Sequence, residues 1–301
     1  MRVLKTILYF SIFKYPLTDE EIFTYTNISS KEEVKKQLSV LLDKKIVFKT
    51  DNYYTNGSTP ELISRRIKGN KMANEIMPKA IKISRKIAKF PFVESVNLSG
   101  SLSKGYYDLG DDIDFFIITK PNRLWIARTL LILYKKVFLL NSKKHFCVNY
   151  FISSNNLEIS ERNRFTATEM TTLIPVCGII FYKKLLDANK WVADYFPNQK
   201  NAYNTSLKTV KKPILTLIIE SILNTKAGCF IDDYFRKITL QKWNIKFNHL
   251  EKNDFNIAMK STKNISKHHP QNFQKKVITQ LEIDYKNIIE KYQLELTKEH
   301  A

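Results

Sequence analysis

Little in this sequence marks a secreted, disordered or membrane-spanning chain. Its 301 residues include only 7 glycines, 9 prolines and 3 cysteines. So few glycines and prolines exclude collagen-like and linker-rich chains. Cys147, Cys177 and Cys229 stand apart and form no metal or redox motif, which is typical of a reducing cytoplasm. No apolar run approaches the roughly 18 residues that a membrane span requires, so we expect a cytoplasmic protein with no membrane partner.

Acidic residues are also scarce, because 29 Asp and Glu against 49 Lys and Arg give a formal net charge of +20. The excess is concentrated at residues 59–98, with nine basic and three acidic side chains, and at 161–212, with nine and four. One explanation is a composition set by an AT-rich genome. The other is a polyanionic partner, either a nucleoside triphosphate or a nucleic acid such as DNA or RNA.

The first 58 residues have the element order of a small helical domain that ends in a hairpin. Apolar residues at helical spacing over 3–15 stop at Pro16. Two Ser/Thr-x-x-Glu capping boxes, beginning at Thr18 and Ser30, predict helices to about residues 25 and 43. Residues 46–50 and 53–55 predict two short strands around a tight turn. Three helices and a hairpin in this order resemble a winged helix-turn-helix domain.

The charges of this domain leave its partner open. Its third helix carries lysines but no arginine, which is the commonest reader of guanine. Residues 1–58 hold nine basic and seven acidic side chains, so the domain is only slightly basic. Binding to DNA and docking to a partner protein are therefore both retained as expectations. Residues 59–90 predict a basic helical connector, which Gly69 and Pro78 either kink or divide into two pieces.

Two aspartates at the start of a buried strand carry the first chemical signal. Residues 113–119 are nearly all apolar and predict a strand, with Asp112 and Asp114 at its entry. Alternate strand residues point to the same face, so the two carboxylates would repel each other unless a cation lay between them. Mg²⁺ (or Mn²⁺) suits one or two carboxylates whose coordination is completed by phosphate oxygens.

A Gly-Ser pair at the end of the preceding strand provides the second signal. A short apolar strand near 95–98 leads directly into Gly100 and Ser101. Glycine permits a close backbone approach, and a serine hydroxyl with neighbouring amides at a strand-to-helix turn can hold a phosphate. Lys104 lies three residues further on and would add positive charge for the same anion.

This ordered set resembles the DNA polymerase β-like nucleotidyltransferase superfamily over about residues 93–152. The matching positions are Gly100, Ser101, Lys104, Gly105, Asp112, Ile113, Asp114 and Phe115. The resemblance implies that Asp112 and Asp114 bind the metal and act in catalysis. It also implies that Gly100, Ser101 and Lys104 bind the phosphates of a nucleoside triphosphate donor.

The superfamily usually has a third carboxylate on a following strand, and this chain departs from that pattern. The strand expected at 145–152 has Asn149 at the matching position. An asparagine can ligate a metal through its carbonyl oxygen, but it brings no charge and cannot act as a base. Glu158 and Glu169 are alternative carboxylates whose positions the sequence does not fix.

From residue 161 onward the pattern predicts helices, at about 165–174, 183–196, 213–223, 231–243 and 274–296. We therefore expect an α+β protein with a winged-helix domain at 1–58, a connector at 59–90, a small mixed-sheet nucleotidyltransferase core at 91–160 and a helical C-terminal domain at 161–301. The expected function is transfer of a nucleotidyl group from Mg-NTP to an unidentified acceptor, with release of pyrophosphate. The alternative is a DNA-binding regulator that senses a nucleotide without turnover.

Overall fold

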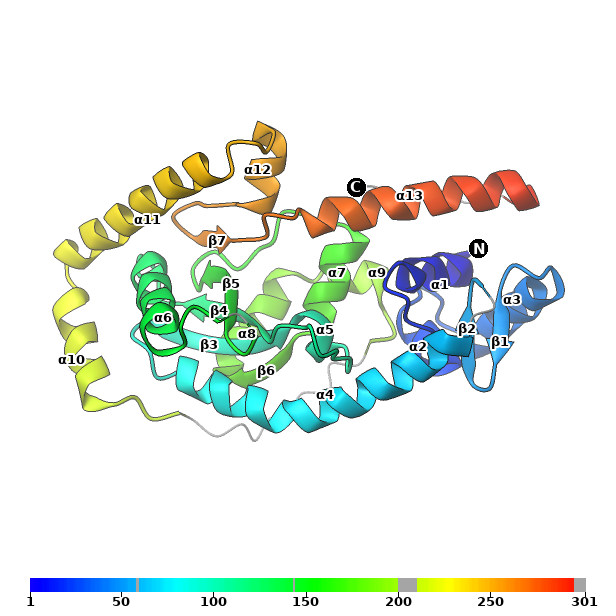
Figure 1. The fold of residues 1–301 in the computed structure, drawn as a ribbon, viewed down its shortest axis with the longest axis horizontal. Coiled ribbons are helices and arrows are strands. Elements are labelled where there is room, and N and C mark those ends of the chain that lie inside the picture. Colours follow the sequence, from blue (N-terminus) through cyan, green and yellow to red (C-terminus); the bar gives the residue numbers. More distant parts are fainter. Residues whose placement is uncertain (58–59, 143, 200–209, 295–301) are drawn as a thin grey trace.

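The fold is α+β, with thirteen helices and seven strands in the part of the chain that the computed structural model describes, namely residues 1–57, 60–142, 144–199 and 210–294 (Figure 1). Two expected features fall partly outside these ranges: the boundary at residues 58–59 and the last two residues of the helix expected at 274–296. In chain order the elements are α1 (Arg2–Ile12), α2 (Asp19–Thr24), α3 (Lys31–Asp43), β1 (Phe48–Thr50), β2 (Tyr53–Thr55), α4 (Pro60–Ile87), β3 (Val93–Ser99), α5 (Gly100–Ser103), β4 (Asp114–Thr119), α6 (Leu124–Phe138), β5 (Cys147–Ser153), α7 (Arg164–Thr171), β6 (Ile174–Cys177), α8 (Ile179–Ala188), α9 (Val192–Tyr195), α10 (Ile214–Leu223), α11 (Lys226–Lys246), α12 (Lys252–Ala258), β7 (Ile265–Lys267) and α13 (Phe273–Tyr292).

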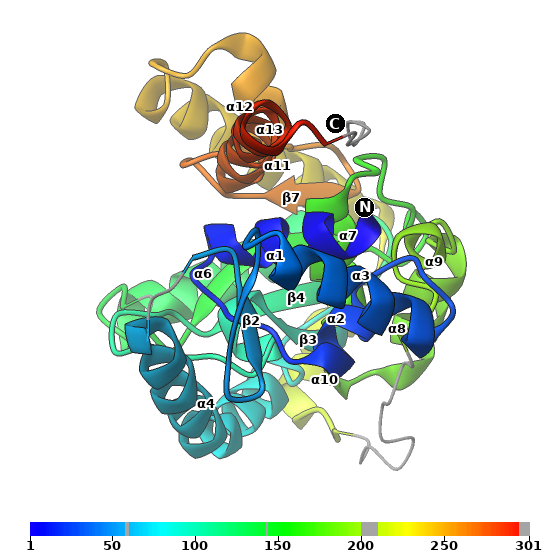
Figure 2. The same ribbon diagram turned by 90° about the vertical axis from the view of Figure 1, so that its right-hand side faces the viewer.

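The predicted three helices and hairpin are present at the N-terminus. Thr18 forms the complete capping box, since its side chain accepts from the Glu21 amide while the Glu21 side chain accepts from the Thr18 amide. Ser30 forms only half of one, because its hydroxyl accepts from the Glu33 amide and donates to Glu32 instead. The apolar faces of α1 and α3 share their core with the C-terminal helix α13. Figure 2 shows α13 and α4 on different sides of these N-terminal elements.

A mixed five-stranded sheet lies at the centre, in the order β6-β3-β4-β5-β7. Strands β4 and β5 are parallel, and every other neighbouring pair is antiparallel. Alternate residues of β4 belong to two clusters: Phe115 and Ile117 pack with residues of α4 and α6, whereas Phe116 and Ile118 pack with residues of α7 and α8. Helices therefore cover both faces, and the four central residues of β4 are apolar because both of its faces are buried.

The expectation that the chain is wholly helical from residue 161 onward is wrong. Strand β6 pairs with β3 and strand β7 pairs with β5, so residues beyond 160 supply both edges of the central sheet. Pro175 lies within β6, which it can do because an edge strand does not need every amide as a donor. Strands this short show no hydrophobic periodicity, and β6 and β7 also lack the tight turn that marked the two strands of the N-terminal hairpin.

The connector is one continuous helix, α4, which passes through Pro78 without dividing. It runs along one side of the molecule from the N-terminal elements to the sheet (Figure 1). The helix expected at 183–196 is instead two, α8 and α9, separated around Asn189, whose buried side chain bonds the backbone of Leu157 and Ile159. Within the described ranges, no single helix is long and apolar enough to cross a membrane, although α10 and α11 pass that test as a pair bent by 94°.

Candidate functional site

The turn from β3 into α5 brings the backbone of Gly100 against the carboxylate of Asp114. Gly100 has a φ of +67°, and a Cβ at this position would lie 2.4 Å from Asp114 Oδ2. Only glycine combines this left-handed conformation with so close an approach. The structure thus explains the glycine of the Gly-Ser pair by its contact with the second aspartate of the Asp-x-Asp pair.

Asp114 also contacts the neighbouring parallel strand. The Nδ2 of Asn149 donates to Asp114 Oδ1 at 3.0 Å, and the Cys147 thiol forms a second hydrogen bond with the same carboxylate. Phe115 of β4 pairs with Val148 of β5, and the next residue, Phe116, pairs with Tyr150. Asn149 is therefore an extra residue in β5 with no partner position on β4. Gly100, Asp114 and Asn149, which lie up to 49 positions apart in the sequence, therefore meet at one end of the sheet.

The environment of Asp114 disfavours its ionised form. Burial raises the pKa of this carboxyl to about 6, and the negative charges of Glu169 and Asp112 add to the rise. The hydrogen bonds from Cys147 and Asn149 act in the opposite direction. Asp112 lies two residues before the start of β4 rather than within the strand. Its side chain is partly exposed, whereas the next residue, Ile113, is buried. Its position nevertheless lets its charge act on Asp114.

Ser101 lies in α5 and is held by the loop that follows this helix. Its hydroxyl donates to Asp111 Oδ2 at 3.0 Å, and the amide of Asp108 donates to the same oxygen at 3.0 Å. The backbone carbonyl of Asp111 in turn accepts from the hydroxyl of Tyr107 at 2.9 Å. Asp111 was not singled out from the sequence, since an acidic residue beside the Asp-x-Asp pair carries no distinguishing signal. Its role here is to close residues 101–111 into a compact loop.

Lys104 joins this loop to helix α7. Its Nζ donates to the carbonyl of Gly100 at 3.0 Å and forms an ion pair with Glu169 Oε1 at 2.8 Å. Of the two glutamates left open by the sequence, Glu169 is therefore the one at the site. Glu158 pairs instead with Arg162, and both side chains are more than half exposed. Only the packing of α7 distinguishes the two glutamates, because they are separated from Asp114 by similar lengths of chain.

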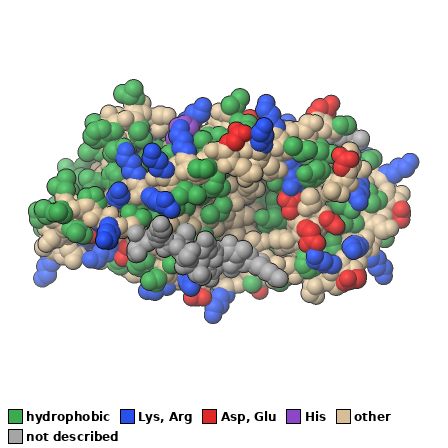
Figure 3. Space-filling view, turned by 90° about the horizontal axis from the view of Figure 1, so that it is seen from below, with side chains coloured by type: hydrophobic (Ala, Val, Ile, Leu, Met, Phe, Trp, Pro, Cys, Tyr) green, Lys and Arg blue, Asp and Glu red, His purple; other side chains and the backbone are tan. Residues whose placement is uncertain are grey.

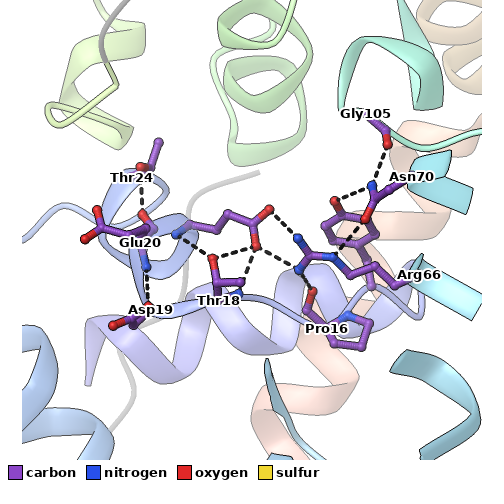
Figure 4. Close-up of polar contacts among 10 residues, drawn as sticks. Pro16, Thr18, Asp19, Glu20, Thr24, Arg66, Asn70 and Gly105 are labelled. Carbon is purple, nitrogen blue, oxygen red and sulfur yellow. Dashed lines mark hydrogen bonds and ion pairs between the residues drawn. The ribbon is translucent and has the colours of Figure 1, made fainter. Parts of the chain in front are cut away.

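The far side of the same loop is anchored to the N-terminal elements (Figure 4). Asn70 on α4 donates to the carbonyl of Gly105, and Arg66, one turn earlier, donates to both carboxylate oxygens of Glu21 at 2.7 and 2.8 Å. Arg66 also donates to the carbonyl of Pro16. This arginine was counted among the basic residues available to a polyanion, but its side chain is only 7% exposed and its donors are used within the protein.

Arg65 is partly buried and donates to the carbonyls of Phe13 and Lys14, whereas the remaining six basic side chains of α4 face solvent. They are Lys68, Lys71, Lys79, Lys82, Arg85 and Lys86. Figure 3 views the side of the molecule on which α4 lies, and Lys and Arg side chains are scattered there among other side chains. This distribution is that of a solvated helix surface.

We expect Gly100→Ala to lower the free energy of unfolding by about 3 kcal/mol, since left-handed strain and overlap with Asp114 would add. Gly110→Ala is the matched control, because a Cβ at Gly110 meets nothing within 4 Å. Urea unfolding of both variants measures the difference. Equal losses in the two variants would contradict the contact between Gly100 and Asp114 as the reason for the glycine.

We compared the chain with protein family models, curated proteins and solved structures. No protein family model, curated protein or solved structure matches the chain. Among the described residues, no group of three or more His, Cys, Asp or Glu side chains is arranged to hold a metal ion by itself.

Proposed function

We propose that this chain is a nucleotidyltransferase of the DNA polymerase β-like type, with a winged-helix N-terminal domain. It would transfer a nucleotidyl group from a nucleoside triphosphate to an acceptor and release pyrophosphate. The observation that carries the proposal is the contact of Asp114 with both Gly100 and Asn149. Residues from two other motif positions thus contact one carboxylate, which supports a common site for the three positions.

The residues around Asp114 fit a divalent cation of the Mg²⁺ or Mn²⁺ kind. Asp112 and Asp114 would hold it, and both offer the hard oxygen donors that such ions prefer. The pKa of Asp114 is raised partly by the charges of Asp112 and Glu169, and a cation held by Asp112 and Asp114 would offset part of this repulsion. When bound, the ion would offset negative charge on the phosphates during transfer.

Ser101 and Lys104 would exchange their present partners for phosphate oxygens. Ser101 now donates to Asp111 and Lys104 to Glu169, so each already binds a carboxylate oxygen. A triphosphate offers more negative charge than either carboxylate and accepts several charge-assisted hydrogen bonds. The loop 101–111 is therefore organised to present one hydroxyl and one ammonium group to an anion.

The same exchange would free a base. Asn149 cannot accept a proton, whereas Glu169 can once Lys104 has moved to the triphosphate. In the proposed step the acceptor hydroxyl oxygen bonds to the α-phosphorus, and its proton passes to Glu169. The bond between the α-phosphorus and the bridging oxygen breaks, and pyrophosphate leaves. Asn149 then serves to orient the Asp114 carboxylate through its hydrogen bond.

We expect Glu169→Gln to slow pyrophosphate release about 100-fold, in keeping with the loss of a general base, while nucleotide binding persists. Adding Asn149→Asp to this variant is expected to restore part of the rate by supplying a carboxylate beside Asp114. Glu158→Gln is the control, because Glu158 lies on the surface. Unchanged turnover in Glu169→Gln would exclude Glu169 as the base.

A thermal-shift screen of the four nucleoside triphosphates, with Mg²⁺, with Mn²⁺ and with a chelator, tests the proposal directly. A ligand at 100 times its dissociation constant stabilises the folded state by about 2.7 kcal/mol, which such a screen resolves. Stabilisation by a nucleotide that depends on the metal, followed by pyrophosphate release with a suitable acceptor, is the expected result. The absence of any shift with every nucleotide would refute it.

A nucleotide-sensing regulator that binds DNA is the second candidate. It is favoured by Asn149, which lacks the charge of the usual third carboxylate, and by the exposure of Lys35 and Lys36 on α3. Nucleotide stabilisation without pyrophosphate release, together with salt-sensitive retention on duplex DNA, would favour the regulator over the enzyme.

A further inference from the structure

Helix α10 packs against the protein through two polar side chains, together with Leu223 at its C-terminal end. The hydroxyl of Thr216 donates to the carbonyl of Lys89 at 2.9 Å. Glu220, one turn later, accepts from the amide of Phe92 at 2.6 Å and forms an ion pair with Lys212. Thr216 is the only residue of α10 that is fully buried. A surface helix of a globular protein normally buries its apolar face instead, so the orientation of α10 is reversed.

Five of the seven aliphatic side chains of α10 consequently face outward, and only Ile219 and Leu223 are partly buried. Five of its ten residues are large aliphatic side chains that are half exposed or more: Ile214 at 78%, Leu215 at 69%, Leu217 at 51%, Ile218 at 50% and Ile222 at 66%. At 100° per residue these positions span an arc of roughly 160°. Phe230 and Tyr234 on the adjoining helix α11 are also exposed, at 77% and 60%. We call these seven residues the α10 patch, and it lies at one end of the long axis (Figure 1), where Figure 3 shows hydrophobic side chains gathered.

The charges around the α10 patch are basic. Residues 210–246 contain seven Lys and Arg and three Asp and Glu. Each of the three acidic side chains is already engaged: Glu220 with Lys212, Asp232 with the amide of Ile126, and Asp233 with Arg236 and Lys237. Lys211 and Lys226 stand exposed just before and just after α10. An aliphatic surface is thus flanked at both ends by ammonium groups.

We propose that the α10 patch inserts into the surface of a bilayer that contains anionic lipid. The aliphatic side chains would enter the acyl-chain boundary, and Lys211 and Lys226 would meet the lipid phosphates. A helix of ten residues is about 15 Å long, too short to span the bilayer, so α10 would lie in the plane of the interface. The expectation of no membrane partner rested on the lack of a long apolar run, which an interfacial helix does not need.

Other occupants fit the α10 patch less well. A second copy of this chain would bring a net charge of +20 against another +20. The anchor residues of protein interfaces are typically Trp, Tyr and Arg, with Leu under-represented, whereas all five exposed apolar residues of α10 are Leu or Ile. Acyl chains have no such residue preference, and binding to a bilayer increases with the buried apolar area and with attraction to anionic lipid. The inference is independent of the proposed nucleotidyl transfer.

Vesicle co-sedimentation of the full chain tests this proposal. We expect binding to vesicles of three parts phosphatidylcholine to one part phosphatidylglycerol, and little binding to phosphatidylcholine alone. Ile218→Glu is expected to lower the partition coefficient at least 10-fold, and so is Lys211→Glu combined with Lys226→Glu. Ile283→Glu on α13 is the matched control, since Ile283 is an exposed isoleucine (44%) outside the patch.

Three results would overturn the proposal. The first is no binding of the wild-type chain to anionic vesicles, and the second is equal binding of Ile218→Glu and wild type. The third is a wild-type dimer at micromolar concentration that Ile218→Glu converts to a monomer, which would make the patch a protein interface. Unchanged thermal unfolding of Ile218→Glu and Ile283→Glu shows that the variants are folded, and the exposure of both side chains predicts this outcome.

Discussion

Asp114→Asn is expected to abolish metal-dependent stabilisation by nucleoside triphosphates while leaving the chain folded. Asparagine has the same shape as aspartate and can still bond Asn149 and Cys147, but it lacks the negative charge that a divalent cation needs. The thermal shift with nucleotide and metal should fall to that of the chelator control, a loss of affinity of at least 100-fold. Asp187→Asn, an exposed aspartate on α8, should retain the full shift. Retention of the shift in Asp114→Asn would remove Asp114 from the proposed site.

The same variant has an expected effect on the metal-free protein that depends on pH. Folding raises the pKa of Asp114 from 3.8 to about 6. Stability from the protonated carboxyl is therefore complete below pH 3.8 and is lost as the pH rises through 6. In chelator, Asp114→Asn should gain roughly 3 kcal/mol relative to wild type between pH 4 and pH 8. Urea unfolding at the two pH values measures this gain, and a pH-independent difference would contradict the raised pKa.

Arg66→Met is expected to destabilise the protein by about 3 to 5 kcal/mol, the usual effect of removing one partner of a buried ion pair. The Arg66 side chain is 7% exposed, and its loss would leave the Pro16 carbonyl without this donor and the Glu21 carboxylate with only Thr18 as a donor. Its ring contacts with Tyr15 and Tyr53 would be lost as well. Urea unfolding measures the change, and Lys68→Met, on the exposed side of the same helix, is the matched control.

A double-mutant cycle separates the ion pair from the packing. Glu21→Gln keeps a side chain that can cap α2 through the Thr18 amide while it removes the charge that Arg66 compensates. Arg66→Met in the Glu21→Gln background should therefore lose less stability than in the wild type. If Arg66→Met and Lys68→Met lost equal stability, Arg66 would not be the stabilising link between the N-terminal elements and α4.

Local rules account for the features that the sequence predicted well. The Thr18 capping box, the hairpin at 48–55 and the continuous apolar run of β4 each depend on neighbours a few residues away. The spacing of the Gly-Ser pair and the two aspartates also proved informative, because one antiparallel pair of strands, β3 and β4, brings Gly100 to Asp114. The parallel pairing of β5 with β4 brings Asn149 to the same carboxylate.

Contacts across long stretches of chain decided the rest. Arg66 is buried and bonded within the protein because Glu21 and Pro16 lie against α4. Likewise, Glu169 was chosen over Glu158 by the packing of α7, which brings it to Lys104. The sheet obtained its edges from β6 and β7, which are too short to carry a pattern of their own.

The sequence by itself determined the helices and strands of the N-terminal region, the α+β class and the residues that converge on Asp114, since periodicity, capping and spacing are local properties. Tertiary structure alone decided which glutamate joins that site, which arginine is buried and which face of α10 points outward. The apolar pattern of α10 is the same whether the helix turns inward or outward. Two hydrogen-bonded side chains, Thr216 and Glu220, fix its orientation through partners more than 120 positions away.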